Sequence, residues 1–132
     1  METLDKVKVA VKALDSKKAY DIKVIKIDDL TILGDYFVIA TGSSSTQVRA
    51  LADEVDEKMS ENKVEPNHIE GKTSEWILLD YGDVIIHVLS RKEREFYSLE
   101  KIWQDGKEID ISEFINRKVV EMLEKHEKNK EI

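Results

Sequence analysis

The sequence predicts a single α/β domain with a mixed β-sheet, helices on the faces of that sheet and an added C-terminal helix. Three observations lead to this class. A one-sided helical stripe opens the chain, an apolar strand pattern runs through a Gly-Ser turn into a second stripe, and two apolar runs are joined by a short turn. Strand and helix patterns that alternate along 132 residues are typical of one α/β domain.

The first helix and strand are predicted from apolar periodicity. Residues 20–27 alternate apolar and polar side chains from Asp21 onwards, which predicts a strand. Lys23 and Lys26 fall on opposite faces of it, so the strand is expected near an edge of the sheet. Residues 3–18 predict a helix packed on the sheet, and its apolar stripe consists of Leu4, Val7, Ala10, Val11 and Leu14.

The next strand and helix form one half of a β-α-β unit. Residues 36–41 are apolar on both strand faces, which predicts a central strand covered on both sides. Residues 42–45 then turn the chain into a helix, with Ser44 or Ser45 as its N-cap. The apolar stripe of this helix consists of Val48, Leu51, Ala52, Val55 and Met59.

A hairpin follows, preceded by a short strand at residues 68–70. Residues 76–79 and 84–89 are apolar on both strand faces and are joined by a turn in which Gly82 can take a positive φ. This is the strongest hairpin signal in the chain.

Beyond the hairpin, residues 91–95 are too charged for the core and are expected to form a hinge. Ser98 is expected to cap a short helix that ends at Gly106. The chain is then expected to divide into an α/β domain at residues 1–107 and a C-terminal helical extension at residues 108–132.

Composition excludes several classes of protein. A net charge of −7 argues against a surface that binds phosphate backbones as a whole, and it favours a basic partner. The densest basic cluster is Arg91, Lys92 and Arg94. The absence of cysteine excludes disulfides, thiol catalysis and thiolate zinc sites. No apolar run approaches the roughly 20 residues that span a bilayer, so a cytoplasmic protein without membrane contact is expected.

The turn at residues 42–45 is the first candidate site. Backbone N–H groups of a Gly-Ser turn at a helix N-terminus can hold phosphate. A nucleotidyltransferase also needs paired carboxylates on the adjoining strand, but here Asp53, Glu54 and Asp56 lie on the helix. The P-loop lysine and further glycines are absent too. A capped helix start is therefore favoured over a phosphate site.

Asp80, Asp83 and His87 form the second candidate. Two carboxylates and an imidazole could bind a divalent metal or perform acid–base chemistry. The alternative is a hairpin turn in which aspartate bonds its own backbone, followed by a hydrogen-bonded core or interface histidine. No HExxH-type spacing supports a metal. The structural interpretation is favoured, and no catalytic residue, metal or cofactor is expected.

Aromatic side chains form the third candidate. Some belong to the core, but Tyr81 lies in a turn and is expected to stay at the surface. Aromatic and arginine side chains beside charged neighbours commonly anchor protein contacts. Base stacking is the rival interpretation, but interleaved basic residues are missing outside residues 91–94. A binding face made by the hairpin is preferred, drawing on Trp76, Tyr81, Phe96, Tyr97 and Trp103.

A long ordered set of motifs covers residues 1 to about 106. It consists of Asp35-Tyr36-Phe37-Val38-Ile39, Thr41-Gly42-Ser43, Glu70-Gly71, Trp76-Ile77-Leu78-Leu79-Asp80-Tyr81-Gly82-Asp83, His87-Val88, Arg94, Tyr97-Ser98-Leu99-Glu100 and Trp103. In order and spacing this set resembles the ribosomal silencing factor family, also called the Iojap family. Gly106 departs from it, because relatives often have alanine there.

The resemblance implies a fold similar to nucleotidyltransferases, without an established transferase activity. It implies a repressor of translation under nutrient limitation, which binds the large ribosomal subunit through its ribosomal protein fourteen and blocks joining of the small subunit. Carried onto this chain, the family's motifs place the partner contacts at Trp76, Asp80, Tyr81, Asp83, His87, Tyr97, Leu99, Glu100 and Trp103.

Two alternatives stand beside this function. A nucleotide-binding or nucleotidyltransferase-type enzyme would gather Gly42, Ser43 and nearby carboxylates around a metal and a nucleotide. A self-associating module, a homodimer, would bury the apolar stripe of the C-terminal helix against a second copy.

Overall fold

In the described part of the chain, six strands form one mixed sheet in the order β3-β4-β5-β2-β1-β6. The computed structural model describes residues 1–27, 34–71, 75–97, 106–112 and 114. Its elements are α1 (Thr3–Ser16), β1 (Tyr20–Lys26), β2 (Tyr36–Gly42), α2 (Ser45–Glu61), β3 (His68–Glu70), β4 (Trp76–Asp80), β5 (Val84–Ser90), α3 (Arg91–Tyr97) and β6 (Lys107–Ile109).

Only one strand pairing in the described sheet is parallel. β2 runs parallel to β5 at the centre, and every other pairing is antiparallel. The expected central position of β2 is confirmed, and residues 37–42 of it are buried. The expected position of β1 near an edge is confirmed as well, because only β6 lies outside it.

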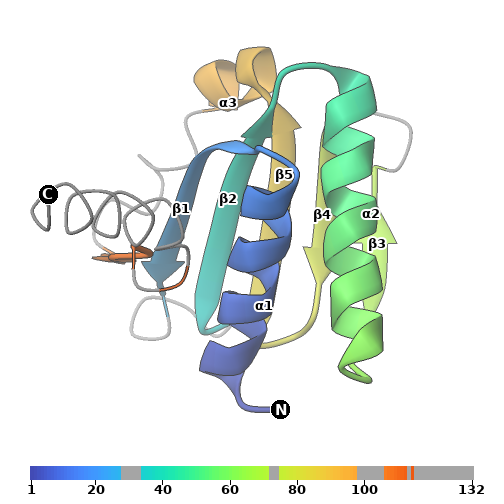
Figure 1. Cartoon of the computed structure of the whole chain (residues 1–132). Coiled ribbons are helices and arrows are strands. Elements are labelled where there is room, and N and C mark those ends of the chain that lie inside the picture. The colour runs from blue at the N-terminus through green and yellow to red at the C-terminus, as the bar shows by residue number, and fades with distance from the viewer. Residues whose placement is uncertain (28–33, 72–74, 98–105, 113, 115–132) are drawn as a thin grey trace, which may run out of the picture.

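Helices α1 and α2 cover one face of the sheet (Figure 1). The predicted stripe of α2 is confirmed completely, since its buried residues are Val48, Leu51, Ala52, Val55 and Met59. Under these helices the strands contribute side chains of one parity, including Val38, Ile77 and Ile86. Burial of this apolar area is the main force that holds helices and sheet together.

The opposite face of the sheet carries a second, smaller apolar cluster. Ile25, Ile27, Phe37, Ile39 and Leu89 are buried there, with Trp76 and Ile85 packed against them. Both faces of the hairpin strands are therefore apolar, which agrees with the two-sided pattern predicted for them.

Two features of the C-terminal half differ from the sequence predictions. Residues 91–97 form helix α3 directly after β5, so the expected hinge at residues 91–95 is wrong. Strand β6 was not predicted, and its pairing with β1 carries the sheet across the expected boundary at residue 107. Two predicted segments lie outside the described residues: the short helix expected from Ser98 and the helical extension beyond Phe114.

Candidate functional site

The turn between β4 and β5 is built by its two aspartates. Asp80 Oδ1 accepts a hydrogen bond of 2.7 Å from the Gly82 backbone N–H, and Gly82 has the expected positive φ of 86°. This is the local aspartate turn favoured from the sequence. One oxygen of the Asp80 carboxylate thus stabilises the turn, and the other, Oδ2, lies 3.6 Å from His68 Nε2.

Asp83 joins the turn to the first helix. Its carboxylate accepts a 2.6 Å hydrogen bond from Thr3 Oγ1 and pairs with Lys6 Nζ at 2.9 Å. Burial alone raises the pKa of Asp83, but the bonds from Thr3 and Lys6 outweigh it and hold that pKa below its usual value. The side chain therefore works as an ionised clamp on α1.

Tyr81 contradicts its expected exposure. Only 5% of the residue is exposed, because it continues the inward parity of Ile77 and Leu79 into the core under α2. Its hydroxyl is buried without a hydrogen-bond partner in the described structure. The pKa of Tyr81 is raised by burial and further by the negative charges of Asp56 and Glu65. The prediction that Tyr81 is a surface residue is wrong.

His87 is a core histidine that positions Trp76. It is 6% exposed, and its Nδ1 accepts a 3.2 Å hydrogen bond from Trp76 Nε1. Its ring also packs edge-on against Phe37 at 5.0 Å between centroids. Burial lowers the pKa of His87 to about 4, so the imidazole is neutral near pH 7. A neutral ring whose Nδ1 already accepts a bond holds the indole in place.

Nearby side chains already accept hydrogen bonds from the backbone N–H groups at the turn of residues 42–45. The Ser43 backbone N–H donates to Gln47 Oε1, and Ser44, the N-cap, accepts from the Gln47 backbone N–H at 3.1 Å. A Cβ on Gly42 would lie 2.9 Å from Val48 N, so glycine is required for close packing. Two backbone donors that a phosphate would need are already bonded, which supports the capped helix start.

Arg94 is buried rather than part of a basic surface cluster. It is 8% exposed, and its Nη1 donates to the Asp21 carbonyl oxygen and, at 2.8 Å, to Thr41 Oγ1. Asp21 has a positive φ of 47° within an irregularity of the β1–β2 register. Arg91 and Lys92 are exposed. The basic surface cluster expected from the sequence therefore consists of these two residues, without Arg94.

A groove opens on the face of the sheet opposite α1 and α2. Its volume is about 480 Å³, and its floor is formed by Trp76 and Leu78, which are both half-buried. Leu78 pairs across β4 and β5 with His87, so the histidine lies beside Leu78 on the same face of the sheet. We call this the Trp76 groove, and it is lined by Glu70, Gly71, Glu75, Trp76, Leu78 and Glu93.

Three glutamates give the Trp76 groove a negative rim. Glu75 is fixed by Ser90, whose Oγ lies 3.3 Å from its Oε2, while Glu70 is exposed on the edge strand β3. Leu78 and the three glutamates were not predicted from the sequence. The parity that Leu78 shares with Trp76 could have indicated it, but the glutamates come from β3, from the residue before β4 and from α3, and only the fold brings them together.

The nine residues expected at the site divide into three groups. Trp76 faces the groove, whereas Asp80, Tyr81, Asp83 and His87 support the hairpin. The backbone of Tyr97 ends α3, while Leu99, Glu100 and Trp103 lie outside the described residues.

Within the described residues no group of three or more acidic or histidine side chains could hold a metal ion. No described helix is long and apolar enough to cross a membrane.

Comparison with known proteins gives a consistent result. The family model described as "Ribosomal silencing factor during starvation" matches residues 1–132. A ribosomal silencing factor from Bacillus subtilis is 37% identical over 111 residues, which cover 83% of this chain and 94% of that protein. One from Halalkalibacterium halodurans is 33% identical over 117 residues, covering 88% of this chain and all of that protein.

A crystal structure of a protein from Chromobacterium violaceum has the same fold. It is 39% identical, has a TM-score of 0.77, and covers 79% of this chain and 88% of its own. Fold and site together define a small mixed α/β domain with an apolar groove rimmed by glutamates. The chain belongs to the ribosomal silencing factor family. The expected family and fold class are both confirmed.

Proposed function

We propose that this protein represses translation in the cytoplasm by binding the large ribosomal subunit and blocking its association with the small subunit. The match of the silencing-factor family over residues 1–132 is the observation that carries this proposal. Steric exclusion requires a stable contact but no catalytic residue. In this structure the candidate catalytic groups already serve the fold, which favours a binding role over an enzymatic one.

The contact is proposed to lie at the Trp76 groove. An indole and a leucine on its floor offer apolar area, and the rim of Glu70, Glu75 and Glu93 is complementary to a basic partner. Ribosomal proteins are commonly basic, and ribosomal protein fourteen of the large subunit is the proposed partner. Asp80 and Tyr97 are proposed to flank this contact, and the roles of Leu99, Glu100 and Trp103 stay predictions.

Cosedimentation with purified large subunits tests the proposal. Glu70→Lys reverses one exposed rim charge without removing any core atom, and we expect it to weaken cosedimentation by about tenfold. Asp5→Lys makes the same charge change on an exposed position of α1, and we expect it to bind like the unaltered protein.

Subunit joining is the second readout, measured by light scattering as the two subunits associate. The unaltered protein should inhibit joining, and Glu70→Lys should inhibit it less. A protein that neither cosediments with large subunits nor changes joining would refute the proposed function. Equal losses for Glu70→Lys and Asp5→Lys would leave the function standing but remove the groove as the contact.

The enzymatic alternative has its own test. A nucleotidyltransferase would bind a nucleoside triphosphate with magnesium at the Gly42 turn, and calorimetric titration would record stoichiometric, metal-dependent heat. We expect none, because Gln47 already accepts from the Ser43 N–H and Ser44 already caps α2.

A further inference from the structure

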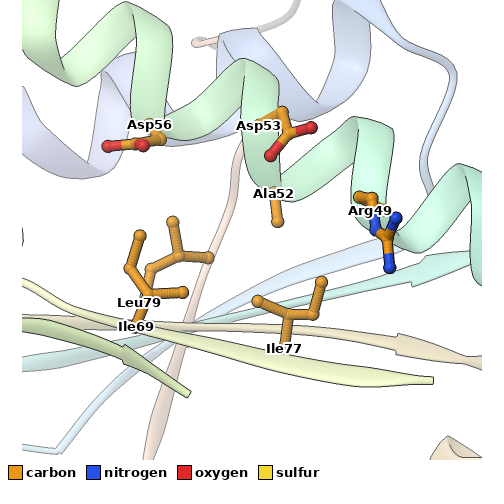
Figure 2. A pocket seen from close by; sticks show the side chains of 7 residues that line it. All are labelled: Arg49, Ala52, Asp53, Asp56, Ile69, Ile77 and Leu79. Carbon is orange, nitrogen blue, oxygen red and sulfur yellow. The ribbon is translucent and has the colours of Figure 1, made fainter. Parts of the chain in front are cut away.

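A second cavity lies on the other face of the sheet, between α2 and the edge strands β3 and β4. Its volume is about 300 Å³. Figure 2 shows charged side chains of α2 above it and aliphatic side chains of the strands below it. We call it the α2 slot, and it is lined by Arg49, Ala52, Asp53, Asp56, Ile69, Ile77 and Leu79.

The floor of the α2 slot is apolar. Ile69 on β3 is half-buried and forms its accessible part, while Ile77 and Leu79 beneath are almost fully covered, with exposures of 2% and 0%. An aliphatic chain can lie along such a floor and carry a charged group to the wall.

The wall of the slot is negatively charged. In the part of the chain that the structure describes, no cation pairs with the carboxylates of Asp53 and Asp56. Lys58, the nearest lysine along α2, pairs instead with Glu54 and Glu61. Arg49 is the cation among the described residues that line the slot, so one part of the slot is positive and the part near Asp53 and Asp56 is negative.

The negative wall continues beyond the slot. An adjoining hollow shares two of its residues and is lined by Asp53, Asp56, Glu57, Ser60, Glu61 and Glu65. The buried, unpartnered hydroxyl of Tyr81 lies within electrostatic reach of Asp56 and Glu65. The slot and the adjoining hollow therefore form one continuous acidic surface along α2, with Asp53 and Asp56 common to both.

We propose that the α2 slot is a binding site for a lysine side chain on a basic segment of a second protein, separate from the ribosomal contact. A lysine lays its aliphatic stem along an apolar surface and keeps its ammonium group among polar or charged neighbours. In the slot the stem lies on Ile69, and the ammonium reaches Asp53 and Asp56. The acidic hollow outside it accommodates further basic residues of the same segment.

An NMR titration with a short alternating lysine–alanine peptide tests this site. We expect the amide resonances of Ala52, Asp53 and Ile69 to shift, and those of the Trp76 groove to stay in place. The same peptide with diaminobutyrate for lysine, compared at pH 6, keeps the charge but shortens the stem, and we expect it to bind about tenfold more weakly. Equal binding of the two peptides would reduce the site to general charge attraction and overturn the proposal.

Charge variants of the protein locate the interaction. Asp53→Lys combined with Asp56→Lys should weaken peptide binding by about tenfold or more. Glu2→Lys combined with Asp5→Lys makes the same change in net charge at exposed positions of the N-terminal region, and should leave binding within about twofold. Equal losses in the two double variants would contradict the assignment to the slot.

Three further measurements separate this inference from its alternatives. The Asp53→Lys, Asp56→Lys variant should still cosediment with large subunits, and a loss would make the slot part of the ribosomal contact. Sedimentation equilibrium should give the same mass with and without these substitutions, since a change would identify a second copy as the occupant. Spermidine should not displace the peptide at equal concentration, because displacement would indicate a small-amine site.

Discussion

At the scale of the residue, Tyr81 is the clearest case of a side chain whose place depends on parity rather than on its turn. The backbone of Tyr81 stands in the hairpin connection, but its ring continues the inward row of Ile77 and Leu79. A residue next to a hairpin turn is exposed only if its side chain points toward the solvent-facing side of the sheet. The unpartnered hydroxyl is the cost of this arrangement.

Removing that hydroxyl should not harm the fold. We expect Tyr81→Phe to leave the free energy of unfolding unchanged or to raise it by about 1 kcal/mol, since it removes a buried unsatisfied group. Tyr81→Ala should lower it by about 3–5 kcal/mol through the cavity it leaves. Urea denaturation of both variants measures this, and a Tyr81→Ala protein of unaltered stability would show that the ring is not in the core.

His87 should make stability depend on pH. Its pKa is about 4 in the folded protein and about 6.5 in an unfolded chain. Between these values the unfolded state binds more protons, so the free energy of unfolding falls as the pH is lowered from 6.5 to 4, by about 3 kcal/mol in total. Above pH 6.5 this contribution is constant.

Substitution isolates the histidine responsible. Thermal or urea unfolding of His87→Gln, measured across the same pH range, should lose most of the slope. His68→Gln changes an exposed histidine on β3 and should retain it. A slope that persists in His87→Gln would assign the effect to other groups.

At the scale of the element, the junction between β2 and α2 depends on one glycine. Gly42 is needed for space, because the first turn of α2 approaches it until Val48 N lies 2.9 Å from where a Cβ would stand. This close approach lets the helix pack directly onto the sheet, and it gives a structural reason for a glycine whose sequence context suggests phosphate binding.

Gly42→Ala should therefore destabilise the protein by about 1–3 kcal/mol, the usual cost of overpacking. Ser43→Ala in the same turn changes an exposed side chain and should cost less than about 0.5 kcal/mol. Guanidinium denaturation compares the two. Equal stability of Gly42→Ala and the unaltered protein would mean that the helix shifts away freely.

Elements with strong periodicity could be predicted from sequence, and those held by backbone or charge could not. The stripe of α2 from Val48 to Met59 identified both its helix and its buried face. Strand β6 escaped prediction because two of its three residues are charged and its pairing with β1 uses the backbone. Arg94 escaped because only the irregular stretch around Asp21 brings a carbonyl oxygen to its guanidinium.

The candidate site was predictable to a smaller extent. Trp76 and the hairpin could be selected from their apolar runs and their aromatic content. The rim of the Trp76 groove could not, because its glutamates come from segments far apart in sequence. The charged wall of the α2 slot lies on one helix, but only the fold places the apolar side chains of β3 and β4 beneath it. Acidic side chains are frequent throughout this chain, so their composition alone selects none of them.

At the scale of the whole molecule, β6 extends the sheet beyond the expected domain boundary. Ile109, Ile111 and Phe114 pack partly buried against the main core. A chain ending at residue 106 should therefore be less stable than one ending at residue 114, by about 2 kcal/mol or more. Calorimetric melting of the two shortened proteins measures this, and identical melting temperatures would show that β6 adds nothing to the domain.

The single parallel pairing between β2 and β5 sets the order in which this molecule can be completed. Tyr36 pairs with Val84 and Gly42 with Ser90, so the middle of the sheet joins two segments separated by α2, β3 and β4. Closing so long a loop costs entropy before any pairing compensates for it. A nascent chain that has not yet reached Ser90 lacks the backbone partners for one edge of β2, and the last strand of the hairpin completes the centre of the sheet.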